Sequence, residues 1–286
     1  MEGQLETCDL LDSRQFLIAV KRLADSFSYG SDASPFLGSG TEYVQSRPYE
    51  PGDPIKCLDW RVTARTGKYF IKEYEAPKRL PCYLLLDTSA SMTVTSQHRS
   101  KYATAVHIAG GLALACLDRI SPVGIVGVGG RDLRIEPSLS REQIYQWLHR
   151  LRTFRFDEET TLTERVAQLL TRLTSASLVI VLSDLHDAGA VGTLKRLGQR
   201  HDVVVIQLSD PAENALEGAG LVRAREAETG REFVTRGRGE WLDQATVDAE
   251  LKRGALDHVL VRTDESFAHR LRHFFQARGV IGRGER

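Results

Sequence analysis

The sequence predicts an α/β fold in which a mostly parallel sheet lies between two layers of helices. Three apolar runs carry this prediction, and each ends in polar residues: 81–87 (PCYLLLD), 178–184 (LVIVLSD) and 202–210 (DVVVIQLSD). Strands covered by helices on both faces have this composition. Helical patterns lie between the runs, so strands and helices alternate along the chain. The expected architecture is a three-layer α/β sandwich.

The first eighty residues have a different pattern. Residues 14–27 place apolar side chains at helical spacing, which predicts an amphipathic helix. A stretch rich in Gly, Ser and Pro follows, and then β-branched and aromatic runs around 42–46 and 68–74, with turn residues between them. We therefore expect residues 1–80 to hold an N-terminal helix and a small β module.

The main domain is expected to span residues 81–286. Beyond the three apolar runs, the pattern predicts strands at 123–130, 132–137 and 258–264, and helices at 99–119, 141–151, 162–173, 189–199, 241–253 and 265–277. A hairpin over residues 221–236, turning at 228–230, is expected as part of an insertion near 211–240.

Composition and charge narrow the class of protein. Lys plus Arg and Asp plus Glu both number 38 among 286 residues, so no net charge favours nucleic acid or an anionic membrane. The longest apolar stretches are about half of the roughly 20 residues that span a bilayer. The four scattered cysteines argue against a disulfide framework or a zinc site, and no secretion signal is visible. We expect a cytoplasmic protein without a membrane span.

Polar side chains follow two of the apolar runs where the strands end. Asp87, Ser89 and Ser91 follow the first run, and Asp184 follows the second. Ligands of an open parallel sheet gather at the carboxyl ends of its strands. As an alternative, residues of these types also cap helices and form turns.

These side chains offer hard oxygen ligands. Thr160 and Thr161 add hydroxyl groups just ahead of the helix at 162–173. Oxygen donors without His or Cys select Mg²⁺, Mn²⁺ or Ca²⁺, and Mg²⁺ needs few protein ligands. One octahedral position would remain for an anionic group, such as a Glu or Asp side chain of a partner.

This pattern resembles the metal-ion-dependent adhesion site of von Willebrand factor A domains. The resemblance rests on DTSAS after a buried strand, on a threonine loop ahead of a helix, and on VLSD later in the sheet. It implies a von Willebrand A-like sheet and a set of metal ligands consisting of Asp87, Ser89, Ser91, Thr160 and Asp184. Thr161 competes with Thr160, because the second loop reads Glu-Thr-Thr where relatives commonly have Gly-Thr-Asp.

Residues 38–75 resemble the signature of the bacterial family called domain of unknown function 58, which precedes such an A-like domain. The matching residues are Arg47-Pro48-Tyr49, Pro51-Gly52-Asp53, Asp59-Trp60 and Ala64-Arg65-Thr66-Gly67. This resemblance implies a non-enzymatic protein–protein interaction factor that works with a MoxR-type AAA+ ATPase or its client, in a chaperone-like or regulatory assembly. The residues themselves favour a structural role for this segment, with a Pro-Gly turn, Arg–carboxylate pairs and Trp60 as a core anchor.

Two other functions stay open. A buried strand that ends in Asp also begins haloacid-dehalogenase-type phosphatases, which would make Asp87 a nucleophile. Those enzymes carry a second Asp two residues later, where this chain has Ser89. The other alternative is a structural scaffold with a vestigial metal site.

Overall fold

The central sheet of the protein has six strands in the order β12–β9–β8–β4–β5–β6. The structure is a computed structural model that describes residues 2–4, 22–24, 43–50, 58–74, 80–118, 120–155, 157–213, 221–225, 232–236 and 243–280. Neighbouring strands run parallel, except that β6 is antiparallel to β5. The predicted α/β fold with a mostly parallel sheet flanked by helices is confirmed.

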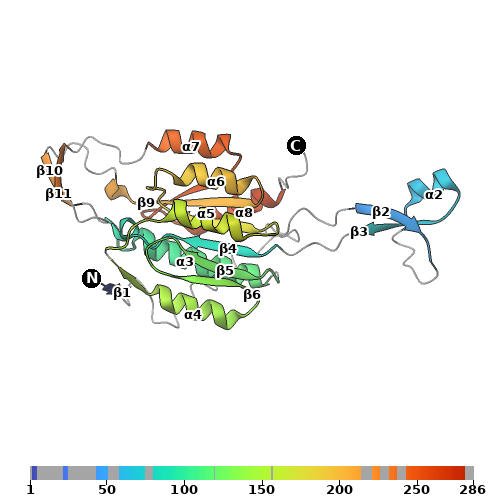
Figure 1. Cartoon of the computed structure of the whole chain (residues 1–286), viewed down its shortest axis with the longest axis horizontal. Coiled ribbons are helices and arrows are strands. Elements are labelled where there is room, and N and C mark those ends of the chain that lie inside the picture. Colours follow the sequence, from blue (N-terminus) through green and yellow to red (C-terminus); the bar gives the residue numbers. More distant parts are fainter. Residues whose placement is uncertain are drawn as a thin grey trace.

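Strands and helices alternate along the described chain (Figure 1). The strands of the sheet are β4 (Cys82–Leu86), β5 (Val123–Gly127), β6 (Arg134–Ser138), β8 (Leu178–Ser183), β9 (Asp202–Ser209) and β12 (Asp257–Arg262). The helices around it are α3 (Lys101–Asp118), α4 (Arg141–Leu151), α5 (Leu162–Arg172), α6 (Ala190–Gly198), α7 (Gln244–Arg253) and α8 (Phe267–Val280).

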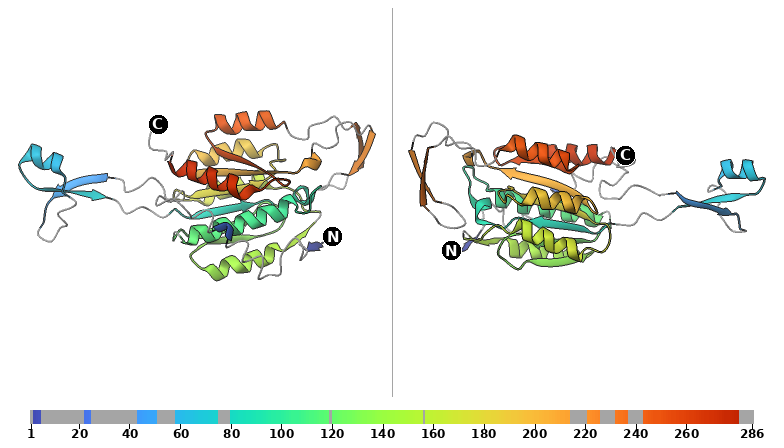
Figure 2. Two further views of the ribbon diagram at one scale, coloured as in Figure 1. Left: turned by 180° about the vertical axis from the view of Figure 1, so that it is seen from behind. Right: turned by 45° about the horizontal axis from the view of Figure 1, so that its top comes forward.

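The strand side chains alternate between two apolar cores. In β4, Leu84 and Leu86 pack in the core formed with α3, α4 and α8, whereas Tyr83 and Leu85 pack in the core formed with α5, α6 and α7. Figure 1 looks onto the layer of α5 and α6, and the left view of Figure 2 looks onto the layer of α3 and α8. The apolar runs in the sequence reflect this burial on both faces of the sheet.

Helix α3 lies in the interior and has little polar surface. Its small residues permit close packing, and a Cβ at Gly111 would lie only 2.7 Å from Cδ2 of Leu23. Leu23 belongs to residues 22–24, which are helical, and Leu23 and Ala24 pack in the same core. These three residues agree with the predicted N-terminal helix, whose remaining residues lie outside the described part of the chain.

The small β module contains the two predicted strands and a helix between them. β2 (Tyr43–Pro48) pairs antiparallel with β3 (Phe70–Tyr74), and α2 (Trp60–Thr66) precedes β3. Asp59 caps α2, because its Oδ1 accepts hydrogen bonds from the N–H groups of the next turn and its Oδ2 accepts one from the Ser46 hydroxyl.

One interpretation of this module is wrong. Trp60 was expected to be a core anchor, but it is 64% exposed, because it lies at the first residue of the short helix α2 and packs in neither core. Figures 1 and 2 show the module beyond the end of the sheet where β4 begins. The predicted Pro-Gly turn lies outside the described residues, and the domain boundary at residue 80 stays a prediction.

Two further β pairs lie outside the central sheet. β10 (Leu221–Arg225) and β11 (Glu232–Arg236) form the predicted hairpin, whose turn at 228–230 lies outside the described residues. β1 (Glu2–Gln4) pairs with β7 (Thr153–Arg155), which the sequence pattern did not predict. Across the described ranges, no helix combines the length and the apolar character needed to cross a membrane.

Candidate metal site

Three loops meet at the carboxyl end of the sheet, and backbone hydrogen bonds hold them together. The first follows β4 and contains the 3-10 helix η2 (Ala90–Thr93), the second spans 157–161 ahead of α5, and the third follows β8. The Asp87 N–H donates to the Leu182 carbonyl at 2.9 Å, which ties the first loop to β8. The Ala90 N–H donates to the Glu158 carbonyl at 2.8 Å, which ties it to the second loop.

Asp87 lies at the centre of this arrangement and is fully buried. Its Oδ1 accepts a hydrogen bond from the Ser89 N–H at 3.0 Å, and its Oδ2 accepts one from the Ser183 hydroxyl at 2.5 Å. The hydroxyl oxygens of Ser89 and Ser91 lie 2.9 Å apart. The first loop therefore brings a carboxylate and two hydroxyl groups to one place, as the DTSAS spacing predicted.

Asp184 is the second buried carboxylate of the site. Burial and the nearby charge of Asp184 raise the pKa of Asp87 to about 7. Burial alone would also raise the pKa of Asp184, but the ammonium of Lys101, with a smaller contribution from His186, outweighs it and holds that pKa below its usual range. The Ser91 hydroxyl adds to this effect, so the first and third loops meet at Asp184.

The second loop lies beside the first. Thr160 forms an isolated β-bridge with Gly129, and the Thr161 hydroxyl donates to the Gly129 carbonyl at 3.0 Å. The Thr161 hydroxyl thus has a backbone partner, and the choice of Thr160 as the ligand of this loop stays a prediction. The described contacts bring Asp87, Ser89, Ser91 and Asp184 together, and they place the backbone of Thr160 in the adjoining loop.

Sequence reasoning missed Glu158, which joins the first two loops. Its buried carboxylate accepts hydrogen bonds from the Thr88 hydroxyl at 2.7 Å and from the backbone N–H and Nε of Arg131, both at 2.8 Å. No local pattern points to this role, because its partners come from distant strand ends. Asp187 lies near Asp184 in sequence, but its carboxylate accepts hydrogen bonds from the backbone N–H groups of Thr163 and Gly189.

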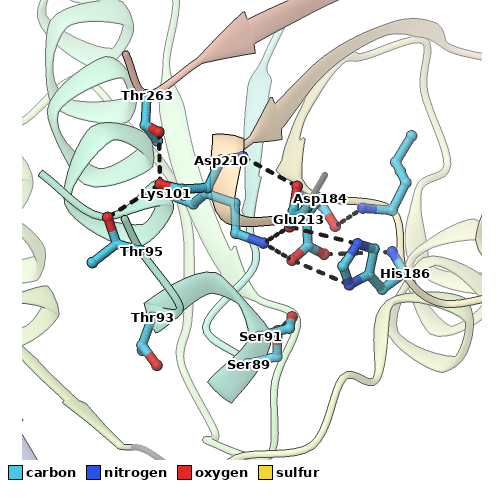
Figure 3. A network of polar contacts seen from close by, with 12 residues as sticks. Ser89, Ser91, Thr93, Thr95, Lys101, Asp184, His186, Asp210, Glu213 and Thr263 are labelled. Atoms are coloured by element: carbon cyan, nitrogen blue, oxygen red, sulfur yellow. Dashed lines mark hydrogen bonds and ion pairs between the residues drawn. The ribbon is translucent and has the colours of Figure 1, made fainter. Parts of the chain in front are cut away.

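Sequence reasoning also missed a group of charged side chains beside Asp184 (Figure 3). The Lys101 Nζ, in the first turn of α3, donates to Asp184 Oδ2 at 2.7 Å and also to Glu213 Oε1. The ring nitrogens of His186 lie 3.7 Å from these carboxylates, Nδ1 from Asp184 and Nε2 from Glu213. Asp184, His186 and Glu213 could surround an ion, but the Lys101 ammonium already pairs with both carboxylates of this group.

The comparisons with known proteins identify the family. The family model described as "Protein of unknown function DUF58" matches residues 45–242, which is more than half of the chain. The chain belongs to the DUF58 family. The match spans both the small β module and most of the strands that build the candidate site.

Several proteins are similar to the chain over most of its length. Uncharacterised proteins of Mycobacterium bovis and Mycobacterium tuberculosis are each 26% identical over 227 residues, which is 77% of this chain and 72% of theirs. Among solved structures, the conserved hypothetical protein BatB of Bacteroides thetaiotaomicron aligns with a TM-score of 0.46 and 17% identity, over 70% of this chain and 99% of that one. An uncharacterised membrane-spanning protein of Vibrio fischeri aligns with a TM-score of 0.24 and 16% identity, over 68% and 95% of the two chains.

The donor set of this DUF58 chain fits a hard divalent cation. The first and third loops offer two carboxylates and two hydroxyl groups, without a thiolate or imidazole at Asp87. Oxygen ligands of this kind suit Mg²⁺, Mn²⁺ or Ca²⁺. Two adjacent buried carboxylates repel each other, and the Lys101 ammonium that pairs with Asp184 is shared with Glu213. Binding of a cation by all five predicted residues stays a prediction.

In the absence of divalent cations, the candidate site predicts that the stability of the folded protein depends on pH in a distinctive way. Because the pKa of Asp87 is raised to about 7, the folded protein keeps a proton there that the unfolded chain releases near its ordinary pKa of 3.8. The stability of the wild type should therefore fall as the pH rises from about 4 to about 7. Asp87→Asn has no such proton to lose, so its free energy of unfolding relative to wild type should increase by about 2 kcal/mol between about pH 5 and pH 8.

Urea unfolding of both proteins in chelator measures this difference. Asp184 does not affect this difference. Its pKa is lowered, so its contribution to stability is lost only when the pH falls below the usual pKa of an aspartate. Parallel pH curves for wild type and Asp87→Asn would show that Asp87 is ionised in the folded state throughout.

Proposed function

We propose that this DUF58 chain is a non-enzymatic protein–protein interaction factor whose recognition site holds a divalent cation, Mg²⁺ before Mn²⁺ or Ca²⁺. The observation that supports it is the convergence of Asp87, Ser89, Ser91 and Asp184 at the carboxyl ends of two central strands. Thr160 would complete the set from the adjoining loop. When bound, the cation would offer a coordination position to a carboxylate of the partner.

The finer fold assignment that we propose is von Willebrand A-like. Strand β4 lies inside the sheet between β5 and β8, and the DTSAS residues follow directly at its carboxyl end. The third-loop Asp184 follows the adjacent strand β8, so the two loops are neighbours. This arrangement supports the assignment, because an adhesion-type site needs these loops side by side at one edge.

The partner that we propose is a MoxR-type AAA+ ATPase or its client, in a cytoplasmic assembly with a chaperone-like or regulatory role. The support for this partner is the family resemblance carried by residues 38–75. A carboxylate on the partner's surface is the group that the cation would recognise. The site therefore predicts that binding of the ATPase depends on Mg²⁺ and on an acidic residue of the partner.

The residue two positions after Asp87 disfavours phosphatase chemistry. Phosphatases of the haloacid-dehalogenase type carry a second Asp there, and this chain has Ser89. A scaffold with a vestigial site remains as the alternative, and it predicts partner binding that is independent of metal.

Metal titration of purified protein tests the proposal. Mg²⁺ at about 100 times its dissociation constant should stabilise the wild type by about 2.7 kcal/mol, which raises the melting temperature by roughly 5–10 °C. Asp87→Asn and Ser89→Ala should lose this gain and also lose Mg²⁺-dependent binding to the purified cognate MoxR-type ATPase. Asp118→Asn is the matched control, because Asp118 is a half-exposed residue at the far end of α3.

Two results would contradict the proposal. The first is an equal effect of Mg²⁺ on wild type and Asp87→Asn. The second is ATPase binding that survives chelation, which would favour the scaffold. Turnover of a generic phosphate ester that disappears in Asp87→Asn would instead support the phosphatase alternative.

A further inference from the structure

Lys101 is a buried cation placed against one of the proposed metal ligands. Its side chain is 1% exposed, and its Nζ donates to Asp184 Oδ2 at 2.7 Å. Its other partner is Glu213 Oε1, on the 3-10 helix that follows β9. Lys101 thus connects the start of α3 with the loops that follow β8 and β9, as Figure 3 shows.

The ammonium uses the same carboxylate that the proposed cation would use. Asp184 Oδ2 faces Lys101, and its Oδ1 accepts a long hydrogen bond of 3.4 Å from the His186 N–H. Two positive charges that share one carboxylate repel each other, and this repulsion is strong where water is excluded. The charge on Lys101 therefore opposes binding of a divalent cation at Asp87 and Asp184.

Glu213, in contrast, favours binding of the cation. Its carboxylate pairs with the Lys101 ammonium, and its Oε2 accepts a hydrogen bond from the Asp210 N–H at 3.1 Å. This backbone contact anchors Glu213 at the end of β9. Lys101 consequently has a second fixed partner when a cation approaches Asp184.

We infer that Lys101 is an internal counter-ion that competes with the divalent cation for Asp184, and that Glu213 limits this competition. The inference rests on the proposed function and extends it, because it names the residues that set how tightly the site holds its cation. Without metal, Lys101 stabilises the loops by pairing with Asp184. With metal, the same charge weakens cation binding.

Two measurements test the roles of Lys101 and Glu213. One is isothermal titration with Mg²⁺, and the other is thermal unfolding in Mg²⁺ or in chelator. Lys101→Met should bind Mg²⁺ about tenfold more tightly and should be less stable than wild type in chelator. Glu213→Gln should bind Mg²⁺ more weakly, because Lys101 then depends on Asp184 alone. Lys101→Arg keeps the charge and should remain within a few-fold of wild type. Lys195→Met is the matched control, since Lys195 pairs with Glu250 on the outer helices.

A purely structural role for Lys101 predicts a different pattern. Lys101→Met would then lose the same stability in Mg²⁺ and in chelator, with unchanged or weaker Mg²⁺ affinity, and the inference would be overturned. If Lys101→Met folds only in Mg²⁺, that dependence supports the inference. If it does not fold at all, Glu213→Gln decides: weaker binding supports the competition, and unchanged or tighter binding contradicts it.

Failure of the inference and failure of the proposed function give different results. Mg²⁺ binding that requires Asp87 but is indifferent to Lys101 and Glu213 leaves the proposed function standing and removes the competition. A wild type whose Mg²⁺ response is the same as that of Asp87→Asn removes the proposed function itself.

Discussion

Gly129→Ala should destabilise the protein by about 3 kcal/mol and separate the first two loops of the site. A Cβ at this position would overlap the Thr88 hydroxyl and the Glu158 Oε1, which hydrogen-bond to each other, and it would lie 2.9 Å from Glu158 Cδ. Neither group can move easily, because Glu158 is buried and is also bonded to Arg131. Urea unfolding measures the loss of stability, and Mg²⁺ titration should show weaker binding.

The neighbouring glycine provides a close control. A Cβ at Gly130 would meet only Glu158 Cγ, at an ordinary contact distance of 3.5 Å. Gly130→Ala should therefore leave both stability and Mg²⁺ affinity nearly unchanged. Equal effects of the two substitutions would mean that the packing between Gly129 and Glu158 does not hold the loops together.

Asp210→Ala should also lower the free energy of unfolding by about 3 kcal/mol, but through the loss of hydrogen bonds. The buried Asp210 carboxylate accepts hydrogen bonds from the hydroxyls of Thr95, Ser96 and Thr263 and from the Ser96 N–H, at 2.7–3.1 Å. These bonds attach the segment that leads into α3 to the ends of β9 and β12 (Figure 3). Without them, the segment before Lys101 loses its anchor.

Hydrogen exchange and urea unfolding test this role. Asp210→Ala should lower the protection of amides at the start of α3, whereas Asp264→Asn, an exposed change beyond β12, should not. Asp210→Asn keeps the shape and should lose less stability than Asp210→Ala. Full stability in Asp210→Ala would show that water replaces the carboxylate at no cost.

The sheet and its helices could be predicted because their signals are local. Apolar runs of five or more residues identify β4, β8 and β9, since helices cover these strands on both faces. The predicted helix at 141–151 coincides with α4, whose serine cap at Ser140 precedes an amphipathic pattern. The three-residue strands β1 and β7 were missed, because a pattern of alternation needs more residues to be recognised.

The small β module shows where residue type misleads. Tryptophan is usually well buried, and Trp60 was expected to follow this tendency. It lies at the first residue of a seven-residue helix, directly after the capping Asp59, and it packs in neither apolar core. The burial of a single side chain depends on what packs against it, which local sequence does not specify.

The sequence by itself determined the layered architecture and the three donors of the first loop, because strand burial and the spacing of Asp87, Ser89 and Ser91 are properties of neighbouring residues. Only the tertiary structure decided what surrounds those donors. Lys101 contacts Asp184 across 83 positions of sequence and Glu213 across 112, and Thr88 contacts Glu158 across 70. Such pairs arise because parallel strands bring their carboxyl ends to one edge, and the charge balance of the site is set there.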